Sequence, residues 1–323
     1  MSAGFVESDE RFAGLRRFTV AVSDGRLAGL RFGTPGAPPL LFCHATGLCA
    51  AAYTPMFKAL GDAVDGFALD MRGHGRSAGP GGPACGAEER RMVDWTRYAA
   101  DIGAALDALT AAVTPQGPWT LAGHSMGGVS CLLASGGRSD VRAVRLFDPP
   151  LMPGPIWMRR GPIWNFLGRR LPIVQGAMRR RPGFESRDAA RENYEGKRFF
   201  RDWAPEGFDG YMADGFLDEA DGSARLACTP EWEAATFLAQ GHTIWSAVSQ
   251  LTTRAKGLRV WGGTGPDSPF RDVSRQRMRR AGAEVIDTPV YGHLWPLVDP
   301  GGAAAFIQDA ARDGVAAGEA AAA

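Results

Sequence analysis

The sequence contains no apolar run of the roughly 20 residues that a membrane-spanning helix needs. It also lacks an excess of charge of either sign, because 36 lysines and arginines nearly balance 35 aspartates and glutamates, for a net charge of +1. This balance provides no electrostatic reason to bind nucleic acid or an anionic membrane. The first 17 residues have no apolar segment of the kind found in secretory signals, so we expect a cytoplasmic protein.

Cysteine is scarce, and its five positions show no short regular spacing: Cys43, Cys49, Cys85, Cys131 and Cys228. An odd count of scattered cysteines favours reduced thiols over a disulfide framework or a zinc site. The sequence also lacks a glycine-rich loop in the strand–helix context of nucleotide-binding sites, and it lacks a His/Asp/Glu cluster with metal-ligand spacing. We therefore expect neither a cofactor nor a metal.

Hydrophobic patterning divides the chain into a core and an insertion. Short strand-like runs alternate with helix-like segments in residues 1–150, and the same rhythm returns in residues 246–323. Such alternation indicates an α/β core, with a mostly parallel sheet that carries helices on both faces. Residues 151–245 lack this rhythm and are rich in aromatic residues, so we expect an inserted cap of short helices.

The most informative motif is Gly123-His124-Ser125-Met126-Gly127-Gly128, which matches the pattern G-x-S-x-G. It follows a short β-prone run and precedes a helix-like run, as the motif requires. Glycines on either side of the serine remove side chains that would collide with the neighbouring strand and helix. The pattern predicts that Ser125 projects from a strained turn as a nucleophile.

A serine hydroxyl needs a base, and the base needs a group that orients it. His293 follows the last strand-like segment and stands last in chain order, so we favour it over His242. Two aspartates stand at strand ends as candidates for the orienting acid. We slightly favour Asp267, after the penultimate strand, over Asp148, after the strand that follows the nucleophile helix.

An oxyanion needs hydrogen-bond donors close to the nucleophile. The backbone N–H of Met126, directly after the serine, is the first candidate. The second donor is expected from the loop His44-Ala45-Thr46-Gly47, whose small residues let the backbone approach the site. We favour the N–H of Thr46, with that of Ala45 as the alternative.

Together these motifs, with Asp70-Met71-Arg72-Gly73-His74-Gly75-Arg76-Ser77 and Gly292-His293-Leu294-Trp295-Pro296, resemble the α/β-hydrolase superfamily over nearly the whole chain. The resemblance implies an eight-stranded, mostly parallel sheet with a helical cap after the sixth strand. Members usually carry the acid as Gly-x-x-Asp after the seventh strand, and here Asp267 comes one or two residues late. Some relatives place the acid after the sixth strand, and Asp148 matches that position.

The sequence therefore predicts a serine hydrolase with a small-molecule ester or lactone substrate. A carbon–carbon bond hydrolase or lyase on the same fold, and a ligand-binding protein without catalysis, remain alternatives. The cap tryptophans Trp157, Trp164 and Trp203 are candidates to line an apolar pocket for an uncharged or aromatic substrate. The paired arginines of the cap are interpreted as solvated helix surface, and we expect a monomer or homodimer.

Overall fold

A computed structural model of the chain describes residues 3–8, 14–92, 94–152, 156–254, 257–289 and 292–308. Nine strands of this part form one sheet, in the order β1-β2-β3-β5-β4-β6-β7-β11-β12. Their bounds are β1 Ala3–Ser8, β2 Arg16–Val22, β3 Gly25–Gly33, β4 Pro39–Cys43, β5 Asp65–Leu69, β6 Trp119–His124, β7 Val141–Phe147, β11 Leu258–Gly263 and β12 Glu284–Thr288.

The pairing confirms the predicted α/β-hydrolase sheet and adds one strand to it. From β5 through β4, β6, β7 and β11 to β12 all neighbours run parallel, whereas β1, β2 and β3 pair antiparallel and join β5 antiparallel. The expected count of eight is wrong by one because β1 was not predicted. This edge strand is defined by its irregular pairing with β2, and its own six residues carry no strong strand pattern.

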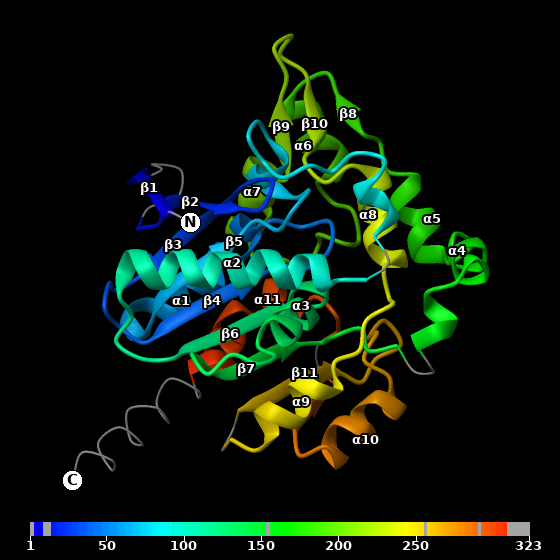
Figure 1. Cartoon of the computed structure of the whole chain (residues 1–323). Coiled ribbons are helices and arrows are strands. Elements are labelled where there is room, and N and C mark those ends of the chain that lie inside the picture. The colour runs from blue at the N-terminus through cyan, green and yellow to red at the C-terminus, as the bar shows by residue number, and fades with distance from the viewer. Residues whose placement is uncertain are drawn as a thin grey trace.

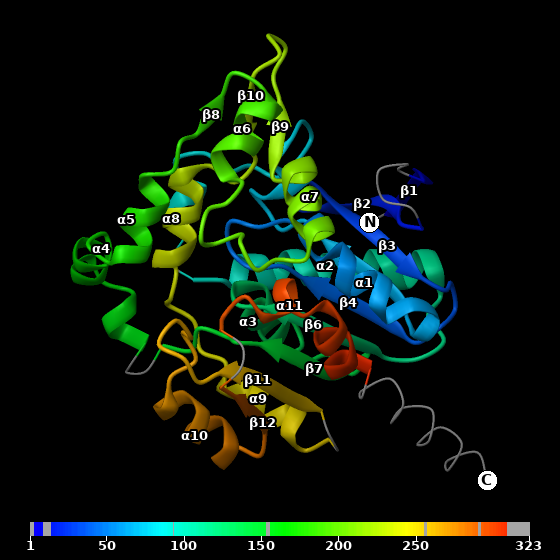
Figure 2. The same cartoon turned by 180° about the vertical axis from the view of Figure 1, so that it is seen from behind.

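Helices cover both faces of the sheet. The α-helices are α1 Thr54–Leu60, α2 Thr96–Val113, α3 Met126–Ala134, α9 Trp245–Thr252, α10 Asp272–Arg280 and α11 Trp295–Val298. A further helical segment spans 300–308. Short 3-10 turns are η1 Ala50–Tyr53, η2 Gly61–Ala63, η3 Gly75–Ala78 and η4 Glu89–Arg91. α2 and α3 lie in front of the sheet in Figure 1, and α1 and α11 lie in front of it in Figure 2. None of the described helices combines the length and apolarity needed to cross a lipid bilayer. The last helical segment is described to residue 308, and residues 309–323 lie outside the described residues.

Two buried clusters, one on each face, hold these layers together. The first joins α2, α3, α9 and α10 to the sheet, and the second joins α1, α11 and the 300–308 helix to it. The central strands β4, β5 and β6 are buried along their whole length. Their apolar runs therefore face helices on both sides, as parallel strands require.

The insertion forms a cap beyond the carboxyl ends of the parallel strands (Figure 1). Its elements are η5 Ile156–Arg159, α4 Pro162–Gly168, α5 Pro172–Met178, β8 Gly183–Phe184, α6 Arg187–Tyr194, α7 Pro205–Asp214, β9 Phe216–Asp218, β10 Ala224–Leu226 and α8 Pro230–Leu238. α4, α5, α7 and α8 each begin with a proline, whose fixed φ and missing N–H suit the first helical position. The expectation of helices alone is wrong, because β8, β10 and β9 form a small antiparallel sheet.

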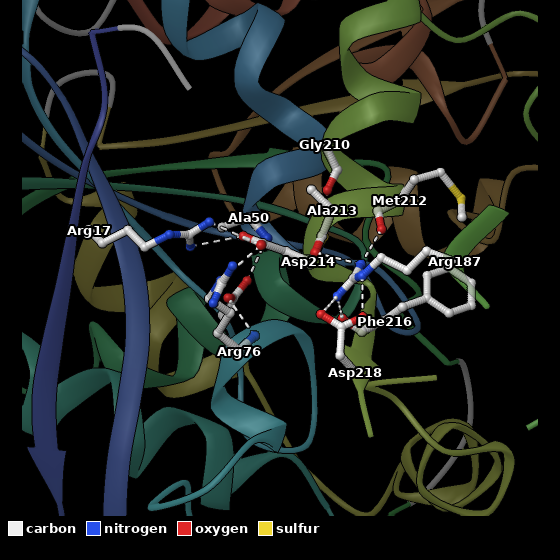
Figure 3. A network of polar contacts seen from close by, with 12 residues as sticks. Arg17, Ala50, Arg76, Arg187, Gly210, Met212, Ala213, Asp214, Phe216 and Asp218 are labelled. Atoms are coloured by element: carbon white, nitrogen blue, oxygen red, sulfur yellow. Dashed lines mark hydrogen bonds and ion pairs between the residues drawn. The ribbon is translucent and has the colours of Figure 1, made fainter. Parts of the chain in front are cut away.

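A buried carboxylate fastens the cap to the core. Asp214, at the end of α7, accepts hydrogen bonds from Arg17 of β2 (3.0 Å for both pairs of atoms) and from Arg76 of η3 (2.9 Å). Figure 3 shows these two guanidinium groups converging on the carboxylate from the core side. In the same view Arg187 binds backbone carbonyls of the cap, including Met212 at 2.7 Å, and so ties the end of α7 to the cap itself.

Candidate active site

Ser125 occupies a sharp turn between β6 and α3. Its backbone has φ 54° and ψ −121°, a strained conformation for a residue with a side chain. A Cβ atom at Gly127 would lie 2.3 Å from the carbonyl oxygen of Cys43, so only glycine lets α3 pack this closely on the end of β4. The N–H of Ser125 donates to the carbonyl of Phe147 at 2.9 Å, which sets the serine beside the end of β7.

His293 lies at the same edge of the sheet, and its Nδ1 is 2.8 Å from Oδ2 of Asp148. Asp148 directly follows β7, is fully buried and has a positive φ of 45°. Its other oxygen, Oδ1, accepts the hydroxyl of Ser268 at 2.6 Å. With both oxygens engaged, the carboxylate holds the imidazole with Nδ1 as donor, which leaves Nε2 free to accept a proton.

The preference for Asp267 as the partner of His293 is wrong in this structure. Asp267 is exposed and makes no hydrogen bond or ion pair within the described part of the chain. The loop after β11 does reach the site, but its next residue, Ser268, points inward and contacts Asp148 instead. The alternative weighed from sequence, Asp148, is the residue that the fold brings against His293.

Two backbone N–H groups, in the two segments that pack at this turn, donate no hydrogen bond among the described residues. Met126 is the first residue of α3, so its N–H has no partner within the helix. The loop after β4 packs against this turn through Gly127, and Thr46 in that loop is partly exposed, with no hydrogen bond from its N–H among the described residues. The N–H of Ala45 instead donates to the hydroxyl of Tyr53 at 3.3 Å, which favours Thr46 over Ala45 as the second donor.

Two of the remaining histidines, His44 and His124, support the fold around the site. Nε2 of His44 accepts the N–H of Met71 at 2.9 Å, linking the ends of β4 and β5. Nδ1 of His124 lies 2.7 Å from the hydroxyl oxygen of Tyr53, and the ring centroid of His124 is 4.7 Å from that of His293. Burial lowers the pKa of both His44 and His124 well below the ordinary value, so both rings are neutral.

His242, the alternative base, forms no hydrogen bond or ion pair with a carboxylate among the described residues, although the charge of Asp94 acts on its ring. Its ring stacks on Trp95 with centroids 4.8 Å apart, and only 5% of the residue is exposed. Burial, and next the charge of Arg159, lower its pKa to about 4. This histidine therefore packs the junction between cap and core as a neutral ring.

The three cap tryptophans have different surroundings. Trp203 is 6% exposed and packs against Phe200 and Tyr211 in the cap interior. Trp164 donates its ring N–H to the carbonyl of Leu238 at 2.9 Å, whereas Trp157 is 71% exposed. Trp203 therefore packs in the cap core, and a contact with substrate stays a prediction for all three tryptophans.

Sequence reasoning missed Ser268 and Tyr53. Both act through hydrogen bonds between segments far apart in the chain, and neither stands in a motif, so the sequence carried no signal for them. Among the residues that the structure describes, no group of three or more His, Cys, Asp or Glu side chains is arranged to hold a metal ion.

Comparisons with known proteins agree with this architecture. A model described as "Alpha/beta hydrolase family" matches residues 40–306. The fold is similar to that of E-2-(acetamidomethylene)succinate hydrolase (19% identity, 94% of this chain and 98% of that chain, TM-score 0.68). It is also similar to a thioesterase domain from the curacin biosynthetic pathway (15%, 91% and 99%, TM-score 0.69) and to a thermophilic esterase from Thermogutta terrifontis (18%, 92% and 98%, TM-score 0.58). No curated protein matches the sequence.

Proposed function

The chain belongs to the alpha/beta hydrolase family, and from this premise we propose that it is a serine hydrolase acting on a carboxylic ester or lactone through an acyl-enzyme. One observation carries the proposal. Ser125, on its strained turn, lies at the strand edge that also holds the hydrogen-bonded pair His293–Asp148.

In the proposed reaction, Ser125 Oγ attacks the carbonyl carbon while Nε2 of His293 takes the hydroxyl proton. The N–H groups of Met126 and Thr46 stabilise the negative oxygen of the tetrahedral intermediate, and the N-terminus of α3 adds its positive end. The proton on His293 then passes to the departing alkoxide, which leaves an acyl group on Ser125. Water, activated by His293, hydrolyses that acyl group and restores the serine.

Asp148 assists these reaction steps without bonding to the substrate. Its buried carboxylate fixes the tautomer of His293 and stabilises the charged ring that forms in each half-reaction. Ser268, and through it Arg275 (Nη2 to Oγ 3.2 Å), holds the second carboxylate oxygen in place.

The test is turnover of a panel that contains activated esters, lactones and vinylogous diketones by the wild type and by Ser125→Ala. We expect ester or lactone hydrolysis that falls by several orders of magnitude in the variant, with an unchanged circular dichroism spectrum. Turnover of diketones alone would favour carbon–carbon bond hydrolysis. A wild type inert toward the whole panel would favour a binding protein without catalysis.

The cytoplasmic location and the oligomeric state, monomer or homodimer, stay predictions. All five cysteines lie among the described residues, and none of them forms a disulfide.

A further inference from the structure

A cavity of about 470 Å³ lies between the cap and the loop after β4. Its core side is formed by Thr46, Gly47 and Leu48, so it reaches the residue whose N–H is the proposed second oxyanion donor. Its cap side follows the end of α5, the end of α6 and α8. A substrate whose carbonyl oxygen lies at Thr46 can therefore extend into this space.

The cavity has a strong excess of positive charge. Four cationic side chains line it, Arg179, Arg180, Arg181 and Lys197, against one carboxylate, Glu233. Only Arg180 is paired with that carboxylate. Within the described residues, Arg179, Arg181 and Lys197 form no ion pair, and all three are exposed.

Arg180 is the least exposed of the four cations that line the cavity, and it corrects the interpretation of the cap arginines as solvated surface. It donates to Glu233 and to the hydroxyls of Tyr194 (3.1 Å) and Tyr211 (2.6 Å). The pair also rests on the loop after β4, since a Cβ at Gly47 would lie 2.6 Å from Oε1 of Glu233 and 3.3 Å from Nη1 of Arg180.

The positive charge of Arg180 acts on Lys197. Its Nζ lies 4.7 Å from the centre of the Tyr194 ring, and its pKa is lowered by partial burial and by the charge of Arg180. Cations that repel one another around one cavity are stabilised by an anion placed between them. Arginine and lysine together at such a mouth suit a carboxylate, which accepts charge-assisted hydrogen bonds from both.

We propose that this cavity is a carboxylate subsite, in which Arg179 and Lys197 receive an anionic end of the substrate while its ester lies at Ser125. The proposal deepens the hydrolase function proposed above and rests on it. It names the substrate class as an ester that carries a free carboxylate at a distance from the scissile bond.

The kinetic test uses matched 4-nitrophenyl esters, namely the monoesters of straight dicarboxylic acids from six to eight carbons and the monocarboxylic esters of equal length. Charge-assisted hydrogen bonds contribute about 1.5–3 kcal/mol. We therefore expect the carboxylate ester to have the higher kcat/KM, on the order of tenfold or more, for at least one chain length. The ratio should decrease at high salt, because the cations are exposed.

The variant Arg179→Gln/Lys197→Met should bring the ratio of the two kcat/KM values close to one. Arg169→Gln is the matched control, because Arg169 is an exposed cap arginine that does not line the cavity. A ratio near one in the wild type at every length, or a preference that survives in the double variant, would overturn the subsite.

A binding measurement separates this proposal from the proposed function. Titration calorimetry of adipate against Ser125→Ala protein, with hexanoate and 1,6-hexanediol as references, reports on the subsite without catalysis. Suppose that the wild type hydrolyses no ester, while adipate binds and the double substitution weakens that binding. This result would support the subsite and refute the hydrolase. Ester hydrolysis without adipate binding or carboxylate preference would refute the subsite alone.

Discussion

Replacement of Asp148 by asparagine keeps the size of a fully buried side chain and removes only its charge and one acceptor. In the wild type, Oδ2 faces Nδ1 of His293 at 2.8 Å and Oδ1 accepts the hydroxyl of Ser268 at 2.6 Å. The asparagine has one oxygen and one NH₂ group to offer at these two positions. Its orientation decides which tautomer His293 adopts.

The surroundings of Ser268 set that orientation. Its Oγ already accepts the N–H of Phe270 and Nη2 of Arg275, both at 3.2 Å, so its own O–H must donate. The amide oxygen therefore turns to Ser268 and the NH₂ group donates to His293, whose ring proton moves to Nε2. The opposite orientation leaves a buried hydroxyl unsatisfied, at about 1–3 kcal/mol or roughly 5- to 150-fold in population.

A proton on Nε2 prevents His293 from accepting the hydroxyl proton of Ser125. Even the minority with the correct tautomer lacks the negative charge that stabilises the imidazolium. We therefore expect kcat for an activated ester to fall about 10³- to 10⁴-fold, the upper figure being that of the same change in a well-known serine protease. The assay is release of 4-nitrophenolate, with circular dichroism to check folding.

Asp267→Asn is the matched control, since it makes the same chemical change one residue from Ser268 on an exposed side chain. Its kcat should change by less than about threefold, as expected of a surface substitution. A larger loss in the Asp267 variant than in the Asp148 variant, or full activity in both, would refute the assignment of the acid.

Three further predictions concern stability. Gly47→Ala should lower both the melting temperature and kcat/KM, because the φ of Gly47 is +77° and the new Cβ would meet Glu233. The expected loss of folding stability is about 1–3 kcal/mol. An unchanged melting curve would show that the loop relaxes freely. Asp214→Asn should lower the free energy of unfolding in urea by about 2 kcal/mol, since it removes the carboxylate that two core arginines share. A loss below about 0.5 kcal/mol would mean that this contact does not fasten the cap. His242 has a folded pKa of about 4, below its ordinary 6.5, so its neutral form stabilises the fold above pH 6.5 and this contribution is lost as the pH falls toward 4. Relative to His242→Phe, the wild type should therefore lose stability between pH 6.5 and 4, and parallel pH profiles of the two proteins would contradict this.

The sheet was predictable from sequence because its parallel strands are buried on both faces. Leu40 to Cys43 and Trp119 to Ala122 form apolar runs that suit no exposed strand, and short glycine-rich turns bound them. The elbow was predictable for a similar reason, since the spacing of Gly123, Ser125 and Gly127 is imposed by close backbone packing.

The acid was not decided by sequence because Asp148 and Asp267 both follow strands. What separates them is local geometry. The positive φ at Asp148 directs its carboxylate to His293, and the loop after β11 turns Ser268 inward while Asp267 faces solvent. Neither property has a sequence signature of its own.

The cap shows the same limit for charged residues. Arg180 stands in a run of three arginines that suits a solvated surface. It is directed inward by Glu233, 53 positions further along the chain, and by two tyrosine hydroxyls. Such partners come together only through tertiary packing, so the pattern of the run predicts nothing about which arginine is buried.

The most direct test of the central claim is to identify the residue that reacts with a fluorophosphonate. After incubation of the wild-type protein with a fluorophosphonate probe, peptide mass mapping should find one phosphonylated residue, Ser125, and Ser125→Ala should remain unlabelled. Labelling that is absent from the folded wild type, or that falls on another residue and persists in the variant, would contradict Ser125 as the nucleophile.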